Sequence, residues 1–206
     1  MLATEDGGGV ETGVERCLTE FSEATKDAQN LLDIHKVLND GPGRRVKEVS
    51  LNRAVVVFTV AAWQAFIQDL TVHLLSTLQP RQGALTIPAF RLQKVLVHNQ
   101  VRNFSTPSAE HSRDLLLSVG FDPRPHWYWS VGPETITPAQ AHDRLNNWLR
   151  VRHSLAHGDA LPDVAVLHKL ANGGRSLRMK EATRCLRFFE RLSQATADGA
   201  SAELPA

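Results

Sequence analysis

The feature that most constrains the fold is the segment 46–78, which lacks glycine and proline and is apolar on nearly every side in its middle. Val55, Val56 and Val57 are β-branched and favour a strand, but the length and the absence of turn signals favour a helix ended by Pro80. A helix that is apolar all round is typical of the centre of a bundle. The longest apolar run, residues 54–67, has 14 residues. Because about 18–20 are needed to cross a bilayer, we expect no membrane span.

The rest of the chain alternates between helical patterns and turn signals. Ser108 and Thr137 are expected to cap helices, with Pro138 in the first helical position. The pattern VAVLHKL-ANGG-RSLRM predicts a small β-hairpin near 164–179, around its Asn-Gly turn. Apolar spacing predicts helices at 14–38, 46–78, 108–120, 137–158 and 180–196, and a short helix at 88–103. The sequence DGPG predicts a turn at 40–43. Residues 121–135, which are rich in proline and aromatic residues, are expected to form an ordered loop packed by its own rings. The predicted fold is therefore an all-α bundle of four to five helices.

The domain organisation follows from where this patterning starts and stops. The acidic, glycine-rich residues 1–12 are expected to form a disordered tail and have no resemblance to a signal peptide. Residues 13–197 are expected to form a single helical domain, and 198–206 a loose C-terminal tail.

The net charge of +1 over 206 residues argues against a strongly basic nucleic-acid coat protein but conceals an uneven distribution. Residues 1–50 carry 10 acidic and 6 basic side chains, whereas residues 141–191 carry 10 basic and 5 acidic ones. Two cysteines, Cys17 and Cys185, are too few for a disulfide framework, so we expect a reducing, cytoplasmic environment.

The segment NWLRVRHSLAHGD, residues 147–159, is the one that suggests chemistry. Two arginines, Arg150 and Arg152, and two histidines, His153 and His157, lie between its apolar residues. The bare spacing R-x4-H between Arg152 and His157 is weak evidence, because a chain of 206 residues with 17 arginines and 9 histidines is expected to contain about 0.7 such pairs by chance. The context raises its weight, because an apolar helix precedes the arginine and a glycine follows the histidine.

The sequence RHSLAHG resembles the RN-x-IAHG signature of HEPN domains, which are small all-α proteins, and is most similar to the RiboL-PSP-HEPN type. The stretches VFTVAAWQAFIQDL and NFSTPSAEHSRDLLLSVGFD resemble further parts of that type, so the resemblance covers roughly residues 45–195. Two positions depart from the pattern: Gln64 replaces a usual glutamate, and His153 replaces a usual asparagine.

The resemblance implies a metal-independent endoribonuclease with no cofactor, acting as a toxin or defence effector, with RNA as substrate and an antitoxin or neighbouring defence protein as a further partner. It implies that the RNA 2′-OH is the nucleophile and that the products carry a 2′,3′-cyclic phosphate and a 5′-OH. In this reading His157 moves protons, because its ordinary pKa lies near neutrality. Arg152 grips the phosphate through its planar fork. His153 is a further catalytic candidate, and Arg150 and Ser154 are candidates for binding substrate.

Helix geometry adds an expectation of its own. Residues five apart point roughly 140° apart on a helix, so one Arg152–His157 pair is poorly placed to act on a single phosphate. A symmetric homodimer solves this by bringing two such pairs into one cleft. Arg150 is an alternative phosphate ligand, because it lies seven residues before His157 on nearly the same face.

Several other readings remain open. His153 and His157 have the i, i+4 spacing of a helical zinc site, although no third ligand is evident. The cluster is alternatively a buried polar network with Asp143 or Asp159, part of a non-catalytic module that binds RNA, nucleotide or protein, or a site for a ligand other than RNA. The aromatic residues Trp127, Tyr128 and Trp129 either anchor a loop or stack on RNA bases. The last helix carries a basic stripe of Lys180, Arg184, Arg187 and Arg191, which either tracks a phosphate backbone or pairs with the acidic first helix.

Overall fold

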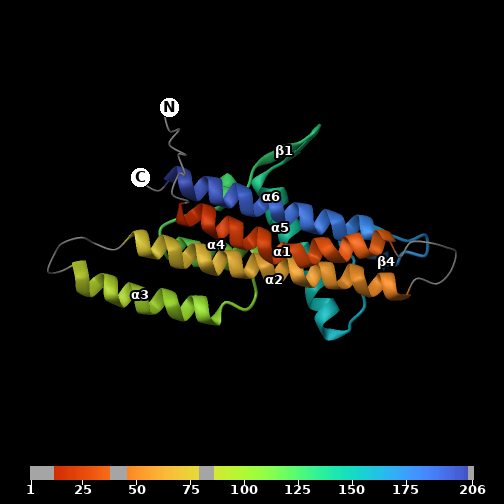
Figure 1. Cartoon of the computed structure of the whole chain (residues 1–206), viewed down its shortest axis with the longest axis horizontal. Coiled ribbons are helices and arrows are strands. Elements are labelled where there is room, and N and C mark those ends of the chain that lie inside the picture. The colour runs from red at the N-terminus through yellow and green to blue at the C-terminus, as the bar shows by residue number, and fades with distance from the viewer. Residues whose placement is uncertain (1–11, 38–45, 79–85, 204–206) are drawn as a thin grey trace, which may run out of the picture.

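The computed structural model describes residues 12–37, 46–78 and 86–203. Within these ranges the chain forms six α-helices, one 3₁₀ helix and two small antiparallel strand pairs (Figure 1). The elements are α1 (Gly13–Val37), α2 (Val46–Thr77), α3 (Thr86–Asn103), α4 (Ala109–Leu117), η1 (Arg124–His126), β1 (Trp129–Val131), β2 (Glu134–Ile136), α5 (Pro138–His157), β3 (His168–Lys169), β4 (Arg175–Ser176) and α6 (Met179–Glu203). The predicted all-α class is confirmed, with six α-helices where four to five were expected.

Helix α2 is the centre of the fold, as its apolar sequence predicts. It contacts α1, α6, α5, α3 and α4, and buries Trp63, Phe66, Ile67 and Leu70 almost completely. Its residues Glu48–Thr77, with a hydropathy of 1.5, are long and apolar enough to cross a membrane, and 56% of the scored window is buried inside the protein. This stretch is longer than the apolar run at residues 54–67 that the sequence shows. A helix of this kind that is more than half buried inside the protein is typical of the core of a helical bundle.

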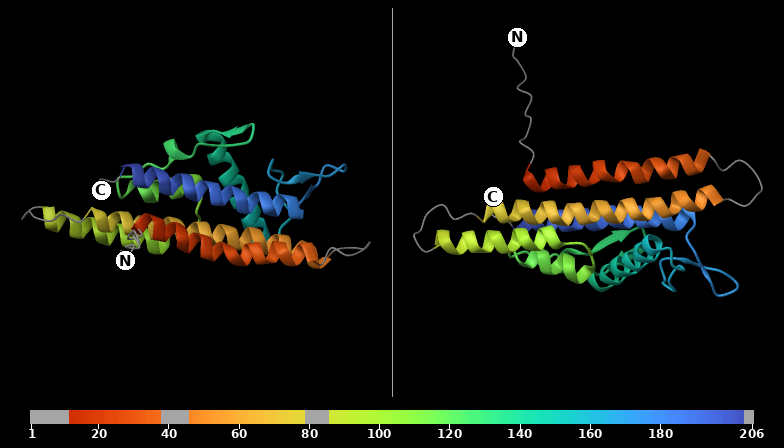
Figure 2. Two further views of the ribbon diagram at one scale, coloured as in Figure 1. Left: turned by 45° about the horizontal axis from the view of Figure 1, so that its top comes forward. Right: turned by 90° about the horizontal axis from the view of Figure 1, so that it is seen from below.

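The long helices α1, α2 and α6 lie side by side, and α5 crosses them at a steep angle (Figures 1 and 2). Helix α3 lies along the outer side of α2 and contacts only α2 and α4 extensively. It is an eighteen-residue helix, so the expectation of a short helix at 88–103 underestimated it.

The predicted helix caps are confirmed. Ser108 accepts a hydrogen bond from the backbone N–H of His111 at the start of α4. Thr137 and Gln140 form a reciprocal capping box at the start of α5, with Pro138 in the first turn. Gly158 ends α5 in the left-handed conformation, with φ of 75°.

The strand predictions need correction. The predicted hairpin near 164–179 exists, but β3 and β4 pair over only two residues each. A second hairpin, β1–β2, occupies part of the segment expected to be a loop, with Trp129 opposite Ile136. Its two-residue turn, Gly132–Pro133, contains a glycine with φ of 57°, a conformation that glycine adopts without steric cost.

The C-terminal helix is longer than predicted. Helix α6 continues to Glu203, so residues 198–203 are helical and do not belong to a loose tail. Gly199 and Ala200 are buried there, because small residues allow close packing against the segment around His126. The predicted turn at 40–43, Pro80, residues 1–11 of the predicted N-terminal tail and residues 204–206 lie outside the described residues.

Candidate functional site

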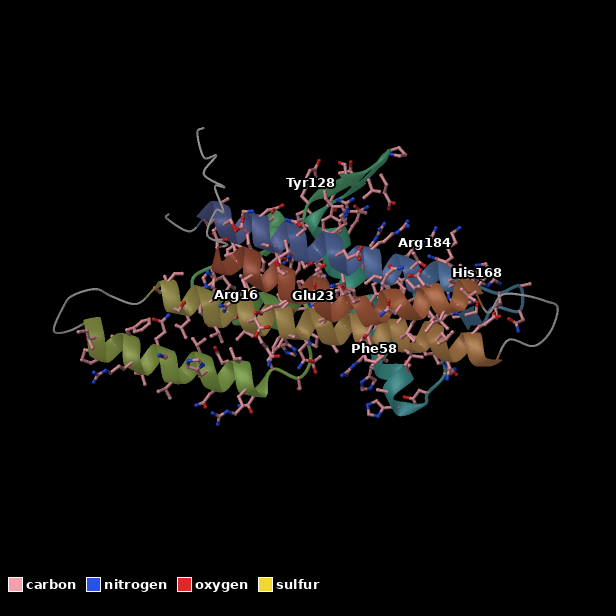
Figure 3. The ribbon with its side chains drawn as sticks, viewed as in Figure 1. Arg16, Glu23, Phe58, Tyr128, His168 and Arg184 are labelled. Carbon is pink, nitrogen blue, oxygen red and sulfur yellow. The ribbon has the colours of Figure 1, made fainter. Side chains whose placement is uncertain are left out.

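Helix α5 carries the candidate site at its C-terminal end. The middle of this helix is fixed against the bundle by Leu145, Trp148 and Leu149, and Val151 is completely buried. Beyond this point the helix crosses α2, and its last turns project from the lower edge of the bundle in Figure 1. Phe58 of α2 lies beside this projecting end (Figure 3). Because the exposed part of α5 continues a buried and packed part, the bundle fixes its direction.

The two histidines of the motif lie together on the exposed surface of this projecting end. The ring centroids of His153 and His157 are 4.3 Å apart, with 53° between the ring planes. Both side chains are exposed, and within the described ranges neither makes a hydrogen bond or an ion pair. Both rings are therefore free to exchange protons with a ligand or with water.

The two arginines of the motif are also unpaired. Arg150 is exposed and Arg152 is half-buried, and neither guanidinium has an ion-pair partner among the residues described. An unpaired guanidinium group is suited to binding an anion such as a phosphate.

Ser154 is placed differently from the other motif residues. Its side chain is buried, and its hydroxyl donates a hydrogen bond of 3.1 Å to the carbonyl oxygen of Arg150. This placement gives Ser154 a structural role inside the helix and does not support the expectation that it orients substrate.

Among the described residues, Asp143 and Asp159 make no ion pair with the motif histidines, so the alternative of a buried polar network gains no support. Asp143 lies 3.1 Å from the Nδ1 atom of His142, its own neighbour in sequence. Asp159 contributes its backbone N–H, which donates to the carbonyl oxygen of Ser154 at 2.9 Å. In the ranges described, His153 and His157 are not joined by a third His, Cys, Asp or Glu that would complete a metal site. The zinc alternative therefore gains no support.

Helix periodicity also places further polar residues in line with the two histidines. His142, Asn146, Arg150, His153 and His157 fall on one face of α5, within roughly 80° of one another. At its other end this face meets Glu110 of α4, whose carboxylate lies 2.6 Å from the Nε2 atom of His142. Arg152 lies off this face, roughly 140° from His157. The regular helix continues through His157, so no local distortion brings the two together.

The aromatic cluster divides into two roles. Trp127 is buried, and its indole N–H donates a hydrogen bond of 3.0 Å to the hydroxyl of Thr196. Trp129 packs against Phe188, with ring centroids 5.9 Å apart. Tyr128 lies between them in sequence and is 58% exposed. The two tryptophans therefore anchor the hairpin, and only Tyr128 has a ring available for stacking.

Sequence reasoning missed two further features of the structure. Val57 and Phe58 are 37% and 45% exposed, although they belong to the apolar run expected to be buried. A hollow of about 250 Å³ lies between α3 and α4, lined by Asn103, Thr106, His111 and Asp114 among others, and none of the five motif residues lines it. No periodicity in the sequence distinguishes these positions from their neighbours, because both depend on where α5 crosses and where α3 ends.

Comparisons with protein-family models, curated proteins and solved structures found no match.

Proposed function

We propose that the protein is a cytoplasmic, metal-independent endoribonuclease of HEPN type, with a composite active site at a homodimer interface. One observation carries the proposal: at a helix end that the bundle holds in place, the exposed side chains of Arg150, His153 and His157 and the half-buried side chain of Arg152 have no hydrogen-bond or ion-pair partner among the described residues. If these side chains served only structural ion pairs or buried networks, they would have such partners, and in the described ranges they have none. The likeness of RHSLAHG to the HEPN signature supports the same conclusion.

The proposed reaction requires only groups that this chain carries. A histidine, His157 of one protomer, accepts the proton of the RNA 2′-OH as the 2′ oxygen bonds to phosphorus. The bond from phosphorus to the 5′ oxygen breaks, and a second histidine delivers a proton to that leaving oxygen. Arg152 binds the phosphate and offsets the negative charge that develops on it. His153 acts beside His157 as an acid–base or orienting group, and Arg150 holds the adjacent phosphate.

The second histidine comes from a second copy of the chain. Within one chain Arg152 and His157 face different directions, so one protomer presents an incomplete site. In the view of Figure 3, the exposed ring of Phe58 lies near the projecting end of α5, and exposed apolar surface there suits burial in a two-fold interface. A toxin or defence role, with an antitoxin or neighbouring defence protein as partner, extends this proposal by resemblance.

The activity test is incubation of the purified protein with single-stranded RNA in the presence of EDTA. We expect cleavage that yields 2′,3′-cyclic phosphate and 5′-OH ends. The variant His157→Ala should lower the rate by about 10²–10⁴-fold, the usual contribution of a general acid–base group. His111→Ala, which removes an exposed histidine of α4, is the control and should leave the rate unchanged. Absence of cleavage by a folded dimer would leave a non-catalytic module as the better description.

A mixing experiment tests the composite site. Wild-type protomers are mixed with increasing amounts of His157→Ala protomers. Because the proposed site needs a histidine from each chain, mixed dimers should be inactive, and activity should fall with the square of the wild-type fraction. Activity that falls only in proportion to the wild-type fraction after verified subunit exchange contradicts a shared site. Phe58→Glu should lower the dimer fraction in sedimentation experiments, because it places a charge in the apolar interface.

A further inference from the structure

The outer face of α6 carries a row of four basic side chains, Lys180, Arg184, Arg187 and Arg191, called here the α6 basic row. All four are exposed. Their spacing of four, three and four residues keeps them within roughly 60° of one another around the helix. The opposite face of α6 buries Cys185, Phe189 and Leu192 in the core. The row is therefore held straight by a helix whose other side is fully packed.

The α6 basic row is not neutralised by the acidic first helix. Three of the five acidic side chains of α1 pair instead with basic residues of α1 itself, in Arg16–Glu20, Lys26–Glu23 and Lys36–Asp33, and among the described residues neither of the other two forms an ion pair with α6. Within the row, Arg184 lies 3.9 Å from Glu181, whereas Lys180, Arg187 and Arg191 have no ion pair with any residue described.

Other acidic residues do not cancel the charge of the row. Glu190 is exposed but lies roughly 90° around the helix from the centre of the row. Glu134 already forms an ion pair with Arg144 on α5. Asp198 falls on the line of the row about two turns beyond its end and keeps its negative charge, because its hydrogen-bond donor is a neutral amide. The unpaired row therefore presents at least three positive charges along one line.

An exposed aromatic ring lies beside the same helix. Trp127 donates a hydrogen bond to Thr196, and Trp129 packs on Phe188. The backbone of Tyr128 is therefore held alongside α6, between the positions of these two α6 residues. Arg191 belongs to the same stretch of helix. In Figure 3, Tyr128 and Arg184 both lie along the upper edge of the bundle, and the motif end of α5 projects from the lower edge.

We propose that the α6 basic row and Tyr128 form a binding surface for single-stranded RNA, separate from the Arg–His cluster. Arginines and a lysine in line bind successive phosphates, and an exposed tyrosine offers a face on which an unpaired base stacks. An acidic protein segment would use the charges but has no need of the ring. The inference rests on the proposed function in sharing its ligand, RNA, and adds a second contact surface for it.

The test measures binding of a fluorescein-labelled, fully 2′-O-methylated single-stranded RNA of about 20 nucleotides. This probe has no 2′-OH nucleophile, so binding is measured on the intact protein without cleavage. Each phosphate contact on a single strand contributes about 0.7 to the slope of log affinity against log salt. Replacing Arg184, Arg187 and Arg191 by Gln should therefore reduce this slope by about two. At 0.1 M salt this corresponds to roughly 100-fold weaker binding. Tyr128→Ala should weaken binding by about tenfold through loss of stacking.

Two controls separate this proposal from its alternatives. Replacing Arg91, Lys94 and Arg102 of α3 by Gln removes the same charge from another exposed helix and should change the slope little. His157→Ala should abolish cleavage of unmodified RNA yet leave binding through the α6 basic row intact, so the two proposals fail independently. Equal loss in both triple variants overturns the inference, as does equal affinity for a polyglutamate peptide of matched charge, which would indicate an acidic protein partner.

Discussion

At the scale of single residues, helical periodicity decides which parts of the motif are available for chemistry. Within RHSLAHG, Ser154 is buried, whereas His153 and His157 are exposed. Residue types alone predicted all of them as polar site candidates, because serine, histidine and arginine each suit a phosphate site. The assignment of Ser154 depends on its bond to the Arg150 carbonyl oxygen, and helical serines commonly make such bonds.

Gly158 is the residue whose conformation most directly affects the site. It has φ of 75° and its N–H donates to the Ser154 carbonyl oxygen, closing α5 immediately after His157. Gly158→Ala should lower the free energy of unfolding by about 1 kcal/mol, because alanine is strained in the left-handed conformation. Gly158→Asn should cost less, since asparagine tolerates it. Thermal unfolding of both variants checks the order.

The same pair of variants tests whether the helix end positions His157. A cleavage rate that falls further in Gly158→Ala than in Gly158→Asn agrees with positioning by the cap. A Gly158→Ala variant with unchanged stability would show that the helix end relaxes without strain.

At the scale of elements, local signals predicted helix starts better than helix ends. Ser108 and Thr137 were identified because a cap satisfies backbone donors of its own helix and needs no tertiary partner. The hairpin β1–β2 was missed because three prolines in 121–135 indicated a loop, although Gly132–Pro133 between alternating residues was the available turn signal. The sequence does not predict the end of α6, because a run of alanine, glycine and serine is typical of a loose tail. Gly199 and Ala200 are buried there because η1 packs against this part of α6.

The contact between α6 and η1 gives a prediction with an unusual sign. Glycine to alanine in a helix interior usually stabilises by about 1 kcal/mol. At Gly199, however, an added Cβ would lie 2.3 Å from the Cγ atom of His126. His126 is held in place by stacking on Phe121 and by Glu203, at 2.7 Å from its Nε2 atom. We expect Gly199→Ala to destabilise the protein by about 1–3 kcal/mol, as overpacked cores do.

A double variant controls for this effect in chemical denaturation. In a His126→Ala background the same Gly199→Ala change should be neutral or stabilising, because the ring it would meet is gone. Destabilisation of equal size in both backgrounds would place the clash elsewhere.

At the scale of the whole molecule, one apolar cluster joins residues from all six α-helices, so the chain is expected to unfold as a unit. A smaller cluster of Ala28, Leu32, Val55, Ala182 and Leu186 joins α1, α2 and α6 at the far end of α1. Beside it, the Nδ1 atom of buried His35 lies 2.8 Å from Asn52 Oδ1. The apolar periodicity predicted the helices of this core. Sequence alone could not predict that α5 crosses α2 with its last turns exposed, because a crossing angle depends on packing between distant residues.

The two cysteines allow this cooperativity to be measured, because they lie on two different helices of the core, Cys17 on α1 and Cys185 on α6. Burial raises the pKa of the Cys17 thiol to about 11, helped by the nearby negative charges of Asp69 and Glu20. Complete burial raises the pKa of Cys185 well above its ordinary value. Because the thiolate is the reactive form, neither cysteine should react with a disulfide reagent at pH 8 while the protein is folded.

The variant Cys17→Ala keeps only Cys185 and reports the opening of α6, whereas Cys185→Ala keeps only Cys17 and reports the opening of α1. If the bundle opens only as a unit, the two remaining thiols should give the same opening free energy after correction for their reactivity in the unfolded chain. Reaction of Cys17 at least tenfold faster than that of Cys185 would show that α1 separates on its own. In that case α2 and α6 would remain packed with α5, and the direction of the helix bearing His153 and His157 would not depend on α1.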